Sequence, residues 1–233
     1  MKVNRMLSII IPVFNEETQL PKLLEHLSVA SAGLIKEIIV VDGGSTDRTA
    51  RIAKDHPKVF YLPSDKGRAV QMNTGANIAN GQILYFLHAD SFPPLYFDRL
   101  IIDAVKKGKK AGCFQMKFDK NHWWLNLMGQ FTKVNHISCR GGDQSLFVEK
   151  SLFHEIGGFD ENYKVYEDNE IIRRLYTKKQ FTVIKQWITT SARLYNRLGV
   201  WNTQRLFIEI YWKRRRGATA EELYSHYYKR VNA

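Results

Sequence analysis

The sequence predicts an α/β fold, a single domain in which helices flank a mostly parallel central sheet and a helical C-terminal extension follows. Two observations carry this prediction. Short apolar runs of the kind found in strands buried on both faces alternate with segments whose apolar residues recur every three or four positions. The early apolar runs also lead into polar or glycine-containing residues, as expected where a parallel strand passes into a right-handed crossover helix.

The first half of the chain follows this alternation closely. Leu20, Leu23, Leu24 and Leu27, for example, lie at helical spacing after the first apolar run. The strands expected here are residues 7–11, 37–41, 58–62 and 83–87. The helices expected here are residues 16–30, a segment that Ser45 or Thr46 could cap, a segment from residue 68 to about residue 80, and residues 97–107.

After residue 110 the alternation loosens. The strands expected in this part are residues 111–118, 144–148 and 181–184, and the helices are residues 150–156, 167–178, 200–216 and 219–229. Residues 121–137 are rich in aromatic side chains and fit neither pattern. No internal repeat or low-complexity linker interrupts the chain. We therefore interpret the break near residue 110 as a change of role within one domain.

Composition narrows the class of protein. The chain has 233 residues, of which 44% are hydrophobic, and this is enough for one sizeable core. Cys113 and Cys139 lie far apart and in no metal-binding spacing, which favours a reduced protein without structural disulfides. The N-terminus shows no secretory signal, and no apolar run approaches the ~20 residues that span a bilayer. We therefore expect a cytoplasmic protein.

Positive charge gathers toward the C-terminus. The formal net charge is +12, and in the last quarter of the chain twelve lysines and arginines stand against three acids. This excess suggests a polyanionic partner, whether nucleic acid, an anionic membrane face or a phosphorylated substrate, although a solvated helix surface is the alternative. Trp201, Phe207, Tyr211 and Trp212 precede the basic residues 213–216. This segment is either a packed helix with a cationic end or an amphipathic helix lying on anionic lipid at the inner membrane face.

Polar residues follow four of the expected strands, at the ends that a parallel sheet brings to one edge. They are Asn15-Glu16, Asp42, Lys66-Gly67-Arg68 and Asp90. An aspartate in a glycine turn can accept a hydrogen bond from a base or a ribose, and a glycine between Lys66 and Arg68 can approach phosphates closely. Asp90 offers a hard oxygen ligand for Mg²⁺ or Mn²⁺, or it caps the next helix. The P-loop and Gly-x-Gly-x-x-Gly patterns are both missing, which argues against an ordinary NTPase or dehydrogenase.

Several stretches, taken in order, resemble the family 2 inverting glycosyltransferases. They are residues 7–17, 40–47, 67–73, 86–94 (with His-Ala-Asp in the Asp-x-Asp region), 142–148, 157–159 and 166–170 (with a Glu-Asp motif), while residues 190–193 fit a bacterial subgroup. The resemblance covers roughly residues 7–205. It implies a GT-A type fold with a Rossmann-like sheet. Residues 1–110 would form the nucleotide-sugar half, residues 111–199 the acceptor and catalytic half, and residues 200–233 a basic helical tail.

The resemblance also implies roles for individual residues. A nucleoside diphosphate sugar, with a UDP-sugar as the first expectation, would be held by Pro12, Glu16, Asp42, Lys66, Arg68, Asn73, Ala89 and Asp90. Asp90 would also bind a divalent metal, Mn²⁺ or Mg²⁺. Asp168 would be the general base that takes the proton of the acceptor hydroxyl, supported by Glu167, with Asp143 and Gln144 on the acceptor side. Transfer would be a single in-line displacement in which the metal and basic groups stabilise the leaving nucleoside diphosphate. The acceptor itself is left open.

Two positions depart from the usual family pattern. His88 stands where the family often has the first aspartate of Asp-x-Asp. It is either a second metal ligand, better suited to Mn²⁺ than to Mg²⁺, or a hydrogen-bond partner of a neighbour. Gly43 stands where a second aspartate often follows Asp42, so one polar contact is lost. Without the resemblance, residues 167–168 also fit acids that stabilise a helix N-terminus, and residues 143–144 fit a turn.

Two other functions agree with parts of the sequence. A non-catalytic protein on the same fold that binds nucleic acid or acidic glycan would account for the basic tail and for His88. The chain lacks the aromatic and basic stripes of RNA-binding motifs, however, so we expect no nucleic acid partner. A nucleotidyltransferase that makes the sugar nucleotide would share the sheet edge, but its glycine-rich loop is missing from residues 12–16.

Overall fold

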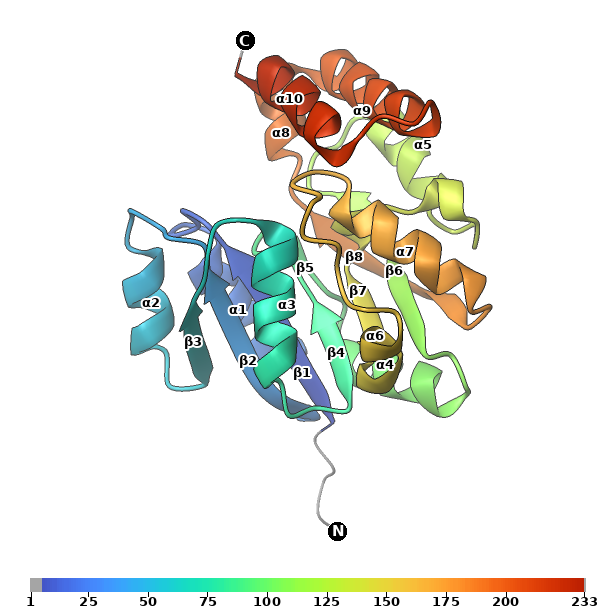
Figure 1. Ribbon diagram of the computed structural model, residues 1–233. Helices are drawn as coiled ribbons and strands as arrows, with labels where there is room; N and C mark the ends of the chain where they lie inside the picture. Colours follow the sequence, from blue (N-terminus) through green and yellow to red (C-terminus); the bar gives the residue numbers. More distant parts are fainter. Residues whose placement is uncertain (1–5, 233) are drawn as a thin grey trace.

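The computed structural model describes residues 6–232, and its strands form one mixed sheet in the order β3-β2-β1-β4-β7-β6-β8-β5 (Figure 1). The strands are β1 (Leu7–Val13), β2 (Ile35–Asp42), β3 (Val59–Pro63), β4 (Ile83–Phe86), β5 (Ser91–Phe92), β6 (Ala111–Phe118), β7 (Leu146–Glu149) and β8 (Phe181–Thr190). Strands β1 to β4 are parallel, β7 runs antiparallel between β4 and β6, and β8 is parallel to β6. The prediction of a mostly parallel α/β sheet is confirmed.

Helices cover both faces of the sheet, and three more cap one end. The helices are α1 (Leu20–Ala30), α2 (Thr49–Asp55), α3 (Arg68–Ile78), α4 (Phe97–Lys106), α5 (Trp123–Phe131), α6 (Lys150–Glu155), α7 (Glu167–Thr177), α8 (Arg193–Leu198), α9 (Val200–Arg215) and α10 (Ala220–Val231). In Figure 1, α3, α6 and α7 lie over the near face, and α8, α9 and α10 gather at the top beside α5. Helices α9 and α10 form the expected helical extension.

The two-sided burial of β1 explains why a run that is apolar except for Ser8 forms this strand. Every residue of β1 is buried. Because successive side chains point to opposite faces, Ile9 and Ile11 pack with α1 and α4, while Ile10 packs with α3, α6 and α7. Pro12 pairs with Val41 of β2 and lies beyond the last pair that β1 makes with β4, so its missing N–H leaves the β1–β4 ladder intact.

The structure differs from the expected elements mainly after residue 90. Strand β8 continues to Thr190 instead of ending at residue 184. A bulge makes this possible, because Ile184 pairs with Phe114 while Trp187 pairs with the next residue, Gln115, so that Lys185 and Gln186 interrupt the pattern without ending the strand. The unassigned aromatic segment contains α5, and two short elements, β5 and α8, were not expected.

Two predicted caps are also different. Neither Ser45 nor Thr46 caps α2, which begins at Thr49; the side chain of Asp47 instead accepts a hydrogen bond from the Thr49 N–H at 2.9 Å. Helix α4 begins at Phe97, seven residues after Asp90, so Asp90 does not cap it. The capping alternative for Asp90 is therefore wrong.

Within residues 6–232, no helix combines the length and the apolar character that crossing a membrane requires. Cys113 and Cys139 are both free thiols. Cys113 is buried, and its sulfur lies 3.2 Å from a guanidinium nitrogen of Arg140. Burial raises the pKa of this thiol to about 11, so it is un-ionised at neutral pH.

Asp98 joins α4 to the loop that leads into β2, and its removal should destabilise the fold. The side chain is fully buried and accepts hydrogen bonds from the N–H groups of Ala32 (2.8 Å) and Leu34 (2.9 Å) and from the hydroxyl of Ser31. Asp98→Ala would leave these donors unpaired, so we expect the free energy of unfolding in urea to fall by about 3 kcal/mol. Asp103→Ala, at an exposed position of the same helix, should change it by less than about 0.5 kcal/mol. Equal stability of the two variants would contradict this role.

Candidate active site

The loops that leave β1 and β2 are fastened to each other at the carboxyl edge of the sheet. Asn15 has a left-handed backbone (φ 55°), and its side-chain oxygen accepts a hydrogen bond from the Thr46 N–H at 2.8 Å. Its own N–H donates to the Ser45 hydroxyl at 2.9 Å, and the Glu16 N–H donates to the Thr49 hydroxyl at 2.7 Å. These contacts fix Glu16 beside the turn that follows Asp42.

Asp42 is the last residue of β2 and is held in one orientation. Only 3% of its surface is exposed. One carboxylate oxygen accepts hydrogen bonds from the N–H (2.9 Å) and hydroxyl (2.6 Å) of Ser45, and the other accepts from the Tyr61 hydroxyl at 3.1 Å. The carboxylate thus lies at the sheet edge with both oxygens already fixed by neighbours.

The position after Asp42 is closely packed against Gln71. The amide of Gln71 donates to the carbonyls of Val13 and Val41, at 2.8 Å each, and so joins β1 to β2. A β-carbon at Gly43 would lie only 3.0 Å from the side-chain oxygen of this glutamine. A side chain at position 43 would therefore crowd Gln71, which would have to shift by a few tenths of an ångström to admit it.

Basic and aromatic side chains line the same edge. The Lys66 ammonium lies 3.6 Å from the centre of the Phe14 ring, which is 37% exposed. Arg68 is the first residue of α3, and its side chain is 60% exposed, with one nitrogen 3.7 Å from a carboxylate oxygen of Glu167. Arg68 thereby links the carboxyl edge of the sheet to the start of α7.

Arg193 joins two of the predicted site residues, a role that the sequence analysis missed. Its guanidinium donates to both carboxylate oxygens of Glu16 and to one oxygen of Asp90, at 2.8 Å in each case. The backbone supports this arrangement, because the Ser191 N–H donates to the Asp90 carbonyl at 3.2 Å. Residues 190–193 fitted a bacterial subgroup in the sequence, and that was the available signal. That resemblance did not indicate which residues Arg193 would contact.

Acidic side chains and one histidine gather at the start of α7. Glu167 and Asp168 are both buried in its first turn, where the helix dipole stabilises negatively charged carboxylates. The two ring nitrogens of His88 face Asp168 at 3.8 Å and Asp143 at 4.0 Å. A β-carbon at Gly142 would lie 1.9 Å from a carboxylate oxygen of Asp168, so this approach requires glycine.

Burial shifts the pKa values of this cluster toward the neutral forms. Burial, and then the charge of Glu167, raises the pKa of Asp168 well above its ordinary value. Partial burial and the nearby Asp90 raise the pKa of Asp143 to about 6. Burial, and then the charge of Arg68, lowers the pKa of His88 to about 4. The imidazole is therefore uncharged at neutral pH, and its contacts with Asp143 and Asp168 are not ion pairs there.

Some predicted site residues serve the fold. The Asn73 side chain bonds the backbone N–H and carbonyl of Phe159, at 2.9 Å each, and so fastens α3 to the loop before α7. Gln144 is buried, and its amide bonds Arg140 and the Cys139 carbonyl, so it braces its own loop. Ala89 is buried in the core between His88 and Asp90.

The arrangement does not form a closed metal cage. Across residues 6–232, no three His, Cys, Asp or Glu side chains are grouped so that they could hold a metal ion on their own. Mg²⁺ in proteins is commonly bound by one or two carboxylates together with substrate phosphates. Asp90, 20% exposed at the sheet edge, fits that kind of site, in which a diphosphate supplies further oxygens. His88 does not fit it as well, because its ring nitrogens face Asp143 and Asp168.

Two surface hollows lie elsewhere. One of about 320 Å³ is lined by Arg48, Arg51, Ile52 and Asp55, and one of about 430 Å³ lies between residues 157–161 and the side chains of Glu170 and Arg174. Neither is lined by Asp42, Asp90 or Asp168. The candidate site is defined instead by charged groups that converge on one sheet edge, which is where ligands bind in open α/β folds.

Comparisons with known proteins identify the family of the chain and proteins that are similar to it. The family described as "Glycosyl transferase family 2" matches residues 8–159. The succinoglycan biosynthesis protein ExoA of Rhizobium meliloti is 26% identical over 72% of this chain and 57% of its own length, so the chain spans little more than half of that relative. A PGL/p-HBAD biosynthesis glycosyltransferase of Mycobacterium tuberculosis is 28% identical over 83% of this chain and 78% of its own length. The crystal structure of S. aureus TarS in complex with UDP is similar in fold, with a TM-score of 0.67 and 19% identity over 80% of this chain and 60% of that one.

Proposed function

Because the chain belongs to glycosyltransferase family 2, we propose that it transfers a sugar from a nucleoside diphosphate sugar to an acceptor hydroxyl, with inversion at the anomeric carbon. One observation carries the proposal. Arg193 joins Glu16 and Asp90 at the sheet edge where Asp42 also ends its strand, while Arg68 extends from that edge to Glu167, next to Asp168. The predicted donor residues and the predicted base are thus neighbours.

A UDP-sugar is the donor that we propose. TarS structures have been solved with UDP and with UDP-GlcNAc, and they share this fold. In this chain, the fixed carboxylate of Asp42 can accept hydrogen bonds from the base or the ribose. The exposed face of Phe14, with Lys66 beside it, offers a surface on which a flat base can stack. Pro12 and Glu16 border the same loop.

The leaving diphosphate needs positive charge. Arg68 and Arg193 provide two guanidinium groups at the edge, and each can bind phosphate oxygens in a bidentate manner. A divalent cation, Mn²⁺ or Mg²⁺, would be held by Asp90 and would neutralise the leaving group when bound. Since Asp90 bonds Arg193, donor binding requires this guanidinium to turn from Asp90 toward the diphosphate. We assign His88 to the surroundings of Asp168 and Asp143.

Asp168 is the base in this proposal. A carboxylate whose pKa is raised by burial is a stronger proton acceptor than an exposed one. It can take the proton of the acceptor hydroxyl as the oxygen attacks the anomeric carbon. Glu167, whose carboxylate lies 3.7 Å from a guanidinium nitrogen of Arg68, holds the start of α7 in place. Asp143, half-exposed beside His88, is the residue that we place on the acceptor side.

Donor binding tests the site by calorimetry with UDP, with and without Mn²⁺. We expect Asp42→Asn to weaken UDP binding by about tenfold or more in both conditions, because a hydrogen bond to a charged group is lost. Asp90→Asn should remove the part of the affinity that depends on Mn²⁺, and a chelator should have the same effect on the wild type. Asp103→Asn, exposed on α4, serves as the control. Wild-type binding by both site variants would show that the donor site is placed wrongly.

A further inference from the structure

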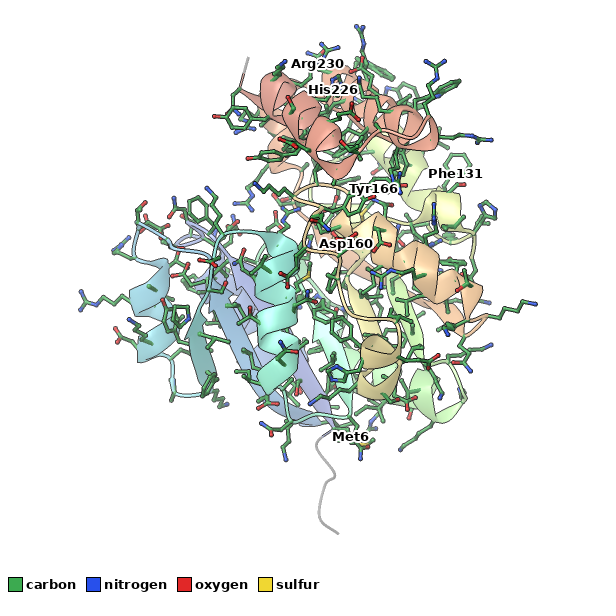
Figure 2. The ribbon with its side chains drawn as sticks, viewed as in Figure 1. Met6, Phe131, Asp160, Tyr166, His226 and Arg230 are labelled. Atoms are coloured by element: carbon green, nitrogen blue, oxygen red, sulfur yellow. The ribbon has the colours of Figure 1, made fainter. Side chains whose placement is uncertain are left out.

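An exposed apolar stripe runs along α5. Trp123, Leu127 and Phe131 are 64%, 42% and 50% exposed, although they are large hydrophobic side chains. Their spacing of four residues places them along one side of the helix, while Leu125 and Gly129 are buried on the other side. Figure 2 shows Phe131 at the outer edge of the molecule. The helix therefore turns its bulkiest apolar side chains toward solvent.

A second stripe lies on α9 and meets the first. Trp201, Ile208 and Trp212 are 58%, 55% and 58% exposed, at intervals of seven and four residues that keep them on one side of the helix. The ring of Trp201 lies 6.1 Å from that of Trp123 and 5.3 Å from that of Trp124, centre to centre. The aromatic surface is defined here as Trp123, Leu127, Phe131, Trp201, Ile208 and Trp212.

Cations accompany the aromatic surface. Arg205 and Arg215 are exposed on α9, three residues from Ile208 and from Trp212 respectively, and the Arg216 guanidinium lies 4.9 Å from the centre of the Trp212 ring. The single acid of α9, Glu209, is turned toward Arg205 (2.9 Å), His226 (2.8 Å) and Arg230 (3.0 Å). The exposed side of α9 is consequently apolar and cationic.

We propose that the aromatic surface docks on the headgroup region of an anionic lipid bilayer. Large apolar side chains exposed together on two adjoining helices mark an interaction site, because burying them releases free energy. Tryptophan rings favour the membrane–water interface, and exposed arginines are attracted to anionic lipid. A second copy of the chain is a poorer partner, because it would bring the same cations face to face.

The aromatic surface is connected to the candidate active site through α9. The Tyr211 hydroxyl donates to the side-chain oxygen of Asn169 at 2.8 Å, and Asn169 directly follows Asp168. The Tyr211 ring also lies edge-on to Tyr166, with centres 5.4 Å apart, and Figure 2 shows Tyr166 between α7 and the C-terminal helices. A bilayer bound to this surface would therefore hold the start of α7 in a fixed orientation.

Sedimentation of the full chain with vesicles tests the proposal. The vesicles are phosphatidylcholine alone or an equal mixture with phosphatidylglycerol. We expect binding only to the mixture, weakened by added salt. A triple variant, Trp123→Ser, Phe131→Ser and Trp201→Ser, should bind about tenfold more weakly or worse, since interfacial binding scales with buried apolar area. The control, Val29→Ser with Phe60→Ser, changes side chains that are 72% and 56% exposed on α1 and β3 and should bind as the wild type does.

The variants are first checked by circular dichroism and thermal unfolding, and UDP binding is measured on the same samples. UDP binding reports on the donor site and does not bear on the docking surface. No sedimentation of the wild type with the mixed vesicles would overturn the proposal, as would equal binding by the triple variant and the control. A dimer that light scattering detects in the wild type and not in the triple variant, without vesicle binding, would assign the surface to a second copy and would also overturn it.

Discussion

Asp168→Asn should lower the rate of sugar transfer by about 10²–10⁴-fold, the contribution typical of a general base. Asparagine preserves the size of the side chain at the start of α7 but cannot accept a proton. Binding of UDP by calorimetry should stay within about twofold of wild type, because Asp168 does not contact the donor edge directly. Release of UDP from UDP-glucose, UDP-galactose and UDP-N-acetylglucosamine, with water as acceptor, provides an assay that needs no identified acceptor.

The control for this variant is Asp160→Asn, a change in the loop before α7 whose aspartate bonds Asn162. Its rate of UDP release should match the wild type. If Asp168→Asn releases UDP as fast as Asp160→Asn does, Asp168 is not the base. If a variant lost both its rate of UDP release and its affinity for UDP, the substitution would have disordered the site. UDP binding is therefore measured for every variant whose rate is measured.

Asp168→Asn should also stabilise the folded protein at neutral pH in metal-free buffer. The raised pKa of Asp168 means that the folded chain holds this proton more tightly than the unfolded chain, whose aspartates titrate near pH 4. That stabilisation is complete below the unfolded pKa and is lost as the pH rises through the folded pKa. Asparagine has no proton to lose. The stability difference in favour of the variant should therefore grow between pH 4 and pH 8, as measured by urea unfolding.

Gly142→Ala should impair transfer almost as severely as Asp168→Asn. The new β-carbon would lie 1.9 Å from a carboxylate oxygen of Asp168, far inside contact distance, so the carboxylate or its loop must move. A shift of about 1 Å in a reacting group can cost about 10²-fold in rate. UDP binding should persist, because Asp42 and the loops that leave β1 and β2 belong to a different part of the sheet edge from Gly142.

Gly141→Ala is the matched control for Gly142→Ala. It adds the same methyl group one residue earlier, at a position where a β-carbon meets no atom within 4 Å and the backbone is extended. Its rate should remain close to that of the wild type. Equal rates for the two alanine variants would mean that the position of Asp168 next to Gly142 does not matter for transfer.

The parts of the fold that could be predicted from sequence are those set by local pattern. Residues 7–11 form a strand buried on both faces because all of them except Ser8 are apolar, and the parallel sheet then brings Asp42 and Asp90 to the same edge. Helix α5 could not be assigned in this way. Its periodic apolar residues face solvent, and the usual inference from periodicity assumes that such residues are buried.

Side-chain partners far apart in sequence were beyond prediction. Arg193 meets Asp90 across 103 residues and Glu16 across 177 residues, and no local pattern encodes such a pairing. The hydrogen bonds of Asn73 met a similar limit, since a single asparagine in a motif does not show that its amide bonds Phe159. Gln144 was expected to face the acceptor beside Asp143, but the side chain turns inward to Arg140.

The contacts of Arg193 also bear on how the chain folds. Strand β8 pairs with β6 and β5, and Arg193 follows it directly, so the edge begun by Glu16 and Asp90 is completed by residues synthesised late. Until Arg193 has been synthesised and has packed at this edge, the carboxylates of Glu16 and Asp90 lack the guanidinium that bonds both of them. Long-range closures of this kind are slow, and they delay the burial of apolar surface. The first 110 residues therefore hold most of the predicted donor-side groups but not Arg193, which bonds two of them. The nascent chain must wait for its last strand before that edge is complete.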